Sequence, residues 1–323
     1  MATFQLWSDE IEAMRPEARA AIEAGTELLA MFERENFEHL PRAERVREQR
    51  AAMEKNYYSV PEAIEREIAG VPCRVFLPEG PARAVYLHFH GGGMVTGAPV
   101  MMDIPNRELA RNFGMAVVSV GYRKGPEHPW PAGPDDGVSV AEWLVDNGTE
   151  EFGTPRILIG GESAGGYMAA IVALRVRDEL HAIERVDGLN LVFGVYDWGR
   201  TPSQRGVRPH GGFDILTPDG IEFFTDCYVP NMTSEERRAP NISPAYANLQ
   251  GLPPSLISVG TADHLLDDSL LLATRAAAAG VEVDLCVLPE MPHAFMIFDC
   301  GIVKDWVVRT NEWFARILRG PDD

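Results

Sequence analysis

GGESAGGYMAA, residues 160–170, sets a single serine, Ser163, among four glycines. The run before it, ILI at 157–159, is short, apolar and β-branched, as expected of a buried strand. The residues after it are good helix formers with one apolar face, which predicts a helix over 164–181. Ser163 is therefore predicted to lie at a sharp turn from strand to helix, where small neighbours leave the backbone enough room.

Residues 161–165 also fit the pattern Gly-x-Ser-x-Gly, in which a strained turn exposes a nucleophilic serine. The pattern alone is a weak signal, because glycines also mark ordinary turns. A catalytic interpretation of Ser163 requires an acid, a base and hydrogen-bond donors elsewhere in the chain.

Apolar runs and helical patterns alternate along most of the chain. A helical region up to about residue 55 precedes a predicted hairpin at 63–78. Six further apolar runs follow, at 83–91, 115–123, 156–161, 189–198, 254–263 and 281–290. Helical patterns separate most of them, at 103–113, 134–147, 164–181 and 266–279. This alternation predicts an α/β protein with a mostly parallel, eight-stranded sheet that helices flank on both faces.

The chain length of 323 residues suits one large domain, and we expect a single domain over 1–323. Residues 199–236 interrupt the alternation with a polar stretch that is rich in Gly and Pro and contains an aromatic cluster. An insertion of that length is more often a functional lid than an idle loop. We therefore expect a helical cap formed by about 1–50 and 199–236, over a catalytic core of about 51–198 and 237–323.

Composition and net charge limit the classes of molecule that the protein is expected to bind. The formal net charge of −19 would repel nucleic acids and anionic membranes. The cysteines are too widely spaced for a metal knuckle or a redox pair, which predicts reduced packing residues; they are Cys73, Cys227, Cys286 and Cys300. The N-terminus lacks the features of a signal peptide, and no run is long enough to span a membrane. We expect a cytoplasmic protein, and the sequence leaves open whether it forms a homodimer.

Neither a metal nor another cofactor is expected. His88 and His90 share one face of a predicted strand, which metal sites can use, but no Cys or acidic residue follows at ligand spacing. The glycines after His90 lack the Lys-Ser/Thr ending of a phosphate loop.

Those glycines are the first candidate partners of Ser163. In open α/β sheets, ligands bind at the carboxyl ends of the strands, and Gly91, Gly92 and Gly93 directly follow a predicted strand. Their backbone N–H groups can converge on one oxygen, as a serine needs when negative charge develops on the carbonyl that it attacks. A phosphate-binding loop and a plain turn are the alternatives.

Three motifs in one order resemble the hormone-sensitive-lipase-like carboxylesterases of the α/β-hydrolase fold. They are HGGG at 90–93, YRKGPEHPWPAGPDD at 122–136 and GESAGG at 161–166. The resemblance runs from about residue 75 to 300. It implies an α/β-hydrolase fold, and an oxyanion hole formed by the backbone N–H groups of Gly91, Gly92 and Ala164.

The same resemblance implies a catalytic triad of Ser163, Asp263 in GTADHLLDD and His293 in LPEMPHAF. Their order along the chain is that of α/β-hydrolases, and both Asp263 and His293 follow predicted strands. Asp197 and Asp267 are rivals for the acid. Asp197 ends an earlier strand, whereas Asp267 suits the first turn of a helix, where a carboxylate offsets the dipole.

The expected reaction is hydrolysis of carboxylic esters with short- to medium-chain acyl groups, through an acyl-enzyme on Ser163. The chain departs from the family pattern at Lys124-Gly125, where Leu-Ala is usual, and at Met94, where a bulky aromatic is common. The candidate substrate-binding residues are Met94, Trp198 and Phe213. Two alternatives remain: an amidase or lactonase with the same triad, and a non-catalytic small-molecule receptor of the same fold.

Overall fold

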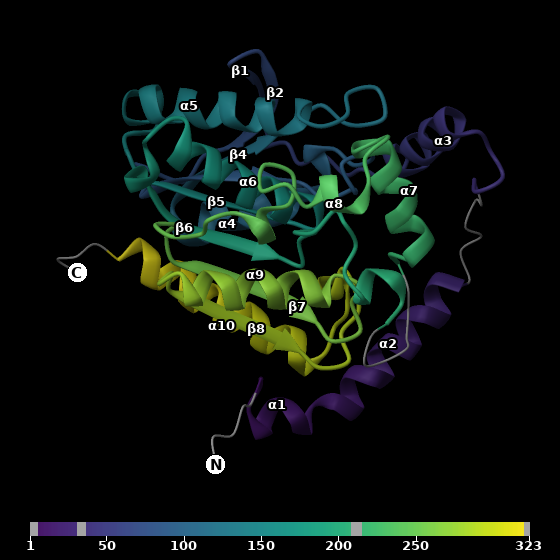
Figure 1. Ribbon diagram of the computed structural model, residues 1–323. Coiled ribbons are helices and arrows are strands. Elements are labelled where there is room, and N and C mark those ends of the chain that lie inside the picture. The colour runs from purple at the N-terminus through teal and green to yellow at the C-terminus, as the bar shows by residue number, and fades with distance from the viewer. Residues whose placement is uncertain (1–5, 31–36, 208–214, 320–323) are drawn as a thin grey trace.

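Eight strands form one sheet in the computed structural model, which describes residues 6–30, 37–207 and 215–319 (Figure 1). The order across the sheet is β1-β2-β4-β3-β5-β6-β7-β8. β1 and β2 pair antiparallel, as do β2 and β4, and all other neighbours are parallel. The strands are β1 (Ile64–Ile68), β2 (Val71–Phe76), β3 (Ala84–Phe89), β4 (Met115–Val120), β5 (Ile157–Glu162), β6 (Val186–Val192), β7 (Ser255–Gly260) and β8 (Val283–Leu288). The predicted mostly parallel, eight-stranded sheet is confirmed.

Helices cover both faces of this sheet. β3, β4 and β7 are buried at every position, which explains why their sequences are continuously apolar rather than alternating. On β3, Val85 and Leu87 face a core shared with α5, α6 and α9, while Tyr86 faces a second core shared with α4 and α10. The helices of the core are α4 (Asp103–Phe113), α5 (Ala132–Phe152), α6 (Ala164–Asp178), α9 (Leu266–Ala278) and α10 (Gly301–Leu318). The four helices predicted between the strands are confirmed, and α10 is an addition to them.

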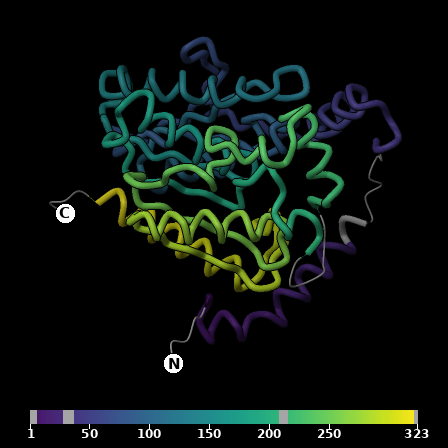
Figure 2. Tube along the Cα trace, in the orientation of Figure 1, coloured from purple at the N-terminus to yellow at the C-terminus, as the bar shows by residue number. Residues whose placement is uncertain are grey.

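The remaining α-helices lie near the N-terminus and in the insertion after β6 (Figure 1). They are α1 (Asp9–Ala13), α2 (Arg15–Ala30) and α3 (Arg42–Glu54) near the N-terminus, and α7 (Pro218–Tyr228) and α8 (Ser234–Arg237) in the insertion after β6. α2 packs against α10 and the loop before it, while α3 lies beside α7 (Figure 2). Of the N-terminal helices, α2 thus packs on the core helix α10, and α3 packs on α7 of the insertion. The predicted boundaries of the cap stay a prediction.

Within the ranges described, no helix combines the length and the apolar character needed to cross a bilayer.

Candidate functional site

Ser163 occupies the turn between β5 and α6 with backbone angles φ 58° and ψ −119°. A Cβ atom at either Gly161 or Gly165 would overlap the carbonyl oxygen of Phe89 at the end of β3. Only glycine at these two positions lets the turn settle against the neighbouring strand. The glycines around Ser163 are therefore required by close backbone packing, and they leave the serine at the carboxyl end of the sheet.

Asp263 and His293 lie beside Ser163, at the ends of β7 and β8. The Ser163 hydroxyl is 3.0 Å from Nε2 of His293, and Nδ1 of His293 is 2.8 Å from Oδ2 of Asp263. Because a carboxylate only accepts, Nδ1 carries the proton, which leaves Nε2 free to accept from Ser163. The second oxygen of the fully buried Asp263 accepts from the Leu265 N–H at 2.8 Å. The structure brings together the three residues expected to form a triad.

Close packing at the end of β7 sets the position of His293. A Cβ atom at Gly260 would overlap the carbonyl oxygen of Met291, which also accepts from the Ala262 N–H at 3.0 Å. On the other side, the Phe193 ring lies 4.6 Å from the His293 ring, measured between centroids. The loop after β8 is thereby held against the loop that carries Asp263.

An N-terminal helix also contacts this loop. Arg15 Nε and Arg19 Nη2 of α2 each lie 2.9 Å from the same carboxylate oxygen of Glu290. The hydrogen bond from Arg19, together with that from Arg15, lowers the pKa of Glu290. The first segment of the chain thus reaches the loop that carries His293.

The expected oxyanion donors surround the serine. Gly91 lies against the turn so closely that a Cβ atom there would be 3.1 Å from the Glu162 carbonyl oxygen and 3.4 Å from Ser163 Cβ. Ala164 begins α6, whose N-terminal dipole favours negative charge nearby. In the described part of the chain, no hydrogen bond uses the N–H groups of Gly91, Gly92 or Ala164. They are available to an oxygen atom bound beside Ser163.

A cavity of about 310 Å³ opens next to Ser163 and His293. Apolar side chains dominate its walls, and Trp198 is among them, as expected. Gly91, Gly92, Gly93, Thr96 and Glu162 also line it. The apolar lining residues are Met53, Met101, Met102, Phe193, Val195, Trp198, Ile215, Leu216, Ile221, Phe224, Leu265, Ala294 and Met296.

The structure corrects the expectation for Met94, which is fully buried and does not line the cavity. Its backbone has φ 61°, and its side chain ends so close to Gly133 that a Cβ atom there would be 2.8 Å from the Met94 methyl carbon. The positive φ turns the side chain into the core instead. The third candidate, Phe213, lies outside the described residues.

Sequence reasoning missed the methionines of the cavity. Met53 lies in the last turn of α3, Met101 and Met102 directly precede α4, and Met296 lies three residues after His293. The adjacent pair at 101–102 was the one available signal, because methionine often lines adaptable apolar sites. Phe224 of α7 also lines the cavity, while its neighbour Phe223 lies beneath the Arg45 guanidinium, 3.7 Å from ring centroid to Cζ.

The rival acids are engaged elsewhere. Asp197 accepts from the Gly199 N–H at 2.6 Å and from the Tyr246 hydroxyl at 2.8 Å. Asp267 lies in the first turn of α9, as predicted, and accepts from the Ser203 N–H at 2.8 Å. Neither has a hydrogen bond with His293 in the described part of the chain.

Other titratable groups near the site have structural partners. His88 lies 2.8 Å from the Ser119 hydroxyl and 3.1 Å from the Glu162 carboxylate, measured from its two ring nitrogens. Among described residues, no group of three or more His, Cys, Asp and Glu side chains is arranged to hold a metal ion. Cys73, Cys227, Cys286 and Cys300 are all free thiols.

The chain is similar to proteins of known fold and activity, both in sequence and in structure. A family described as the alpha/beta hydrolase fold matches residues 86–297. Carboxylesterase NlhH of Mycobacterium tuberculosis is 35% identical over 239 residues, which cover 72% of this chain and 73% of that one. Ethyl acetate hydrolase of Pseudomonas putida is 30% identical over 234 residues, covering 70% and 71%. A crystal structure of a hormone-sensitive lipase from a metagenome library superposes with a TM-score of 0.76 at 29% identity, covering 94% and 98%.

Proposed function

Because the chain belongs to the α/β-hydrolase fold family, among its hormone-sensitive-lipase-like carboxylesterases, we propose that it hydrolyses small neutral carboxylic esters through an acyl-enzyme on Ser163. The observation that carries the proposal is the continuous hydrogen-bonded line from Ser163 through His293 to Asp263, at 3.0 and 2.8 Å. It lies at the wall of an apolar cavity that is large enough for a small ligand.

In the first half of the reaction, His293 Nε2 takes the proton of Ser163 as the serine oxygen attacks the ester carbonyl. Asp263 keeps the imidazole in the required tautomer and stabilises its positive form. Gly91, Gly92 and Ala164 donate their N–H groups to the oxygen on which charge develops. Removal of one such donor typically costs about 3 to 4 kcal/mol of barrier.

His293 then gives the proton to the departing alcohol, which leaves the acyl group on Ser163. In the second half, His293 removes a proton from water, and the resulting attack releases the acid and restores the serine. His293 therefore acts as a base twice, toward Ser163 and then toward water. It also acts as an acid twice, toward the departing alcohol and then toward Ser163.

The cavity supports a preference for short, uncharged acyl groups. Its volume of about 310 Å³ is at the low end of the roughly 300–1,000 Å³ that small-molecule sites occupy. Glu162 is the carboxylate among its described lining residues, and it would repel an anionic acyl chain. A butyrate ester should therefore be a better substrate than the corresponding monoester of succinic acid.

A fluorophosphonate probe tests the proposal, because it labels a serine that a neighbouring base has made nucleophilic. We expect stoichiometric labelling of Ser163 by mass spectrometry, together with turnover of p-nitrophenyl butyrate. His293→Ala should lose both, with its fold retained by circular dichroism.

The same experiment separates the alternatives. A wild-type protein that is neither labelled nor active on esters, amides and lactones would be a receptor of this fold. Labelling without ester turnover, but with turnover of an amide or lactone, would keep the triad and replace the substrate class.

A further inference from the structure

The loop after β3, residues 91–97, is held through its carbonyl groups. The Gly92 carbonyl accepts from the N–H groups of Val95 and Thr96, at 3.0 and 2.8 Å. The Met94 carbonyl accepts from the Gly125 N–H at 2.9 Å. The peptide planes of the proposed donors are held in the same way: the His90 carbonyl, coplanar with the Gly91 N–H, accepts from the Tyr122 hydroxyl at 2.7 Å, and the Gly91 carbonyl, coplanar with the Gly92 N–H, lies 2.7 Å from His90 Nδ1.

Two cationic side chains from outside the loop, Arg50 and Lys124, also donate hydrogen bonds to backbone carbonyls in or next to it. Arg50 of α3 donates from Nε to the Val95 carbonyl at 2.8 Å and from Nη2 to the Gly125 carbonyl at 2.7 Å. It also forms a two-pronged ion pair with Glu127, at 2.9 Å in both contacts. Lys124 donates from Nζ to the Gly97 carbonyl at 2.7 Å.

Lys124 does not contact the expected oxyanion donors directly; it contacts Gly97, which packs against Gly91. Gly97 has φ 80°, and a Cβ atom there would overlap the Gly91 carbonyl oxygen and lie 3.0 Å from His90 Nδ1. Gly97 therefore supports the Gly91 peptide directly, and Gly91 in turn lies against Ser163. A displacement of Gly97 would be transmitted to Gly91 without an intervening side chain.

Charges on all sides act on Lys124. Burial, followed by the nearby Arg50 guanidinium, lowers the pKa of Lys124 to about 8, and the carboxylates of Glu54 and Glu127 partly oppose that shift. His90 faces it from the end of β3, where burial and then Lys124 lower the pKa of His90 well below 6.5. His90 is thus neutral at neutral pH, while Lys124 is charged there and loses its charge above about pH 8.

We propose that Lys124 is a positioning residue for ester hydrolysis, whose ammonium group holds Gly97, and through it Gly91, in the orientation that stabilises the oxyanion. A leucine, the usual residue at this position in the resembled pattern, could not make this contact, so the device belongs to this chain. The inference rests on the proposed function and adds to it a residue that does not touch the substrate.

Lys124→Met tests the inference, because methionine keeps an unbranched side chain but removes the charged donor. With p-nitrophenyl butyrate, kcat should fall about tenfold, the order expected for loss of one charge-assisted hydrogen bond, while KM stays within about twofold. The affinity for butylboronic acid should fall by the same factor as kcat, because its tetrahedral adduct on Ser163 presents an oxygen to the same N–H groups. Lys304→Met, which removes an exposed lysine paired with Asp299, is the matched control and should leave all three values unchanged.

A pH profile of the wild type gives a second test, which the variants at position 124 sharpen. Wild-type kcat should decline as pH rises above about 8, where Lys124 becomes neutral, and Lys124→Met should lack this decline. Lys124→Arg, which keeps a cationic donor, should recover most of the lost kcat.

Three results would overturn the inference. These are an unchanged kcat in Lys124→Met, a loss that falls on KM instead, or a Lys124→Arg variant that recovers none of the lost kcat. If wild-type protein turns over esters while Lys124→Met matches it, only the role of Lys124 fails. If wild-type protein neither turns over esters nor reacts with the fluorophosphonate, the proposed function fails and this inference falls with it.

Discussion

The serine turn and the helix α7 beside the cavity are held in place by different kinds of contact. At the turn, backbone meets backbone: Gly161 and Gly165 lie against the Phe89 carbonyl with no space for a methyl group. At α7, side chains make the contacts, such as the Phe224 ring against Gly93. A backbone contact cannot adapt to a larger residue, whereas a side-chain contact can re-pack. Substitutions should therefore act abruptly at the turn and gradually at α7.

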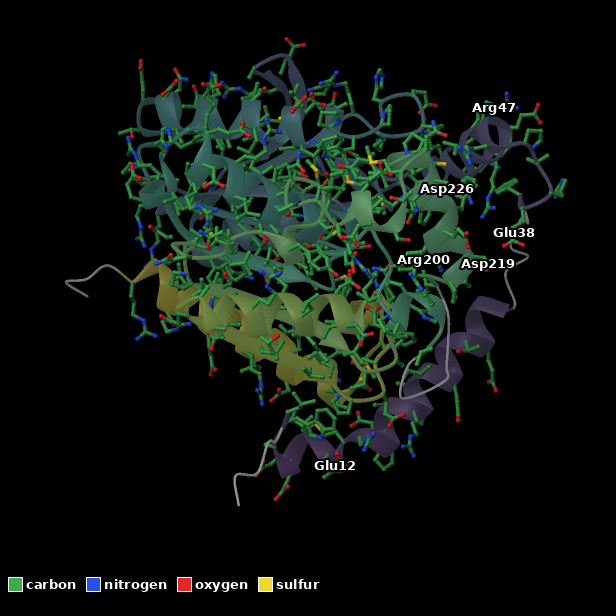
Figure 3. The ribbon with its side chains drawn as sticks, viewed as in Figure 1. Glu12, Glu38, Arg47, Arg200, Asp219 and Asp226 are labelled. Carbon is green, nitrogen blue, oxygen red and sulfur yellow. The ribbon has the colours of Figure 1, made fainter. Side chains whose placement is uncertain are left out.

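Ion pairs hold the outer side of α7. Arg200 donates to the Pro218 carbonyl at 3.1 Å and pairs with Glu222 at 2.9 Å, close to Asp219 at the same end of the helix (Figure 3). Asp226, nearer the other end, lies 3.1 Å from Arg237 and 3.9 Å from Arg42. Exposed pairs of this kind contribute little stability individually.

The largest effect is expected at the turn itself, from loss of the nucleophile. Ser163→Ala should lower kcat for p-nitrophenyl butyrate by at least about 10⁴-fold, since the remaining members of a triad act only through the serine. Its melting temperature should match that of the wild type, because Ala fits wherever Ser fits. Retention of even a tenth of the activity would remove Ser163 from the mechanism.

The next largest effect tests the packing of the same turn. Gly165→Ala should lower the free energy of unfolding by about 3 kcal/mol or more, because the new methyl group would overlap the Phe89 carbonyl oxygen. Gly153→Ala is the control: it has φ 77° and open space around it, so its cost should be limited to about 1–2 kcal/mol of backbone strain. Urea unfolding of both variants measures the difference, and equal losses would contradict the contrast drawn here.

A smaller effect is expected at α7, where the side chains can re-pack. Phe224→Ala should enlarge the cavity and raise the ratio of kcat/KM for hexanoate over acetate esters by about tenfold. Phe223→Ala should leave this ratio unchanged, since Phe223 lies beneath Arg45 and away from the cavity lining. A shift of equal size in both variants would show that α7 acts through its general stability rather than through Phe224.

The smallest effect concerns the ion pairs outside the cavity. Asp226→Asn should change the free energy of unfolding by no more than about 0.5 kcal/mol, because water screens its partly exposed pairs. Asp103→Asn, by contrast, removes the buried carboxylate that Arg74 contacts at 2.6 and 2.7 Å and leaves it with the exposed carboxylate of Glu65, so it should cost about 3 kcal/mol. Thermal or urea unfolding ranks the two.

The contrast also explains which parts of the molecule could be predicted from the sequence. Strands buried on both faces produce continuous apolar runs, so the sheet and the strand ends that carry Ser163, Asp263 and His293 follow from local pattern. Their glycines mark the close backbone contacts.

The cavity was less predictable because its wall comes from distant segments. Met53 reaches it from α3, and its place depends on how that helix packs against α7. Met94 was expected at the wall, but a positive φ, which the sequence pattern does not reveal at a methionine, turns it into the core. Packing between segments, rather than local preference, decides such positions.

The ion pairs between α2 and Glu290, in the loop that carries His293, bear on the order in which the protein is synthesised. Ser163 leaves the ribosome 130 residues before His293, a delay of roughly 10 s at about 5–20 residues per second. Throughout that interval the nascent chain holds Ser163 without His293, the base that the proposed mechanism requires. Arg15 and Arg19 of α2 are already synthesised when Glu290 emerges, so their ion pairs with Glu290 can form as soon as the loop that carries His293 is made.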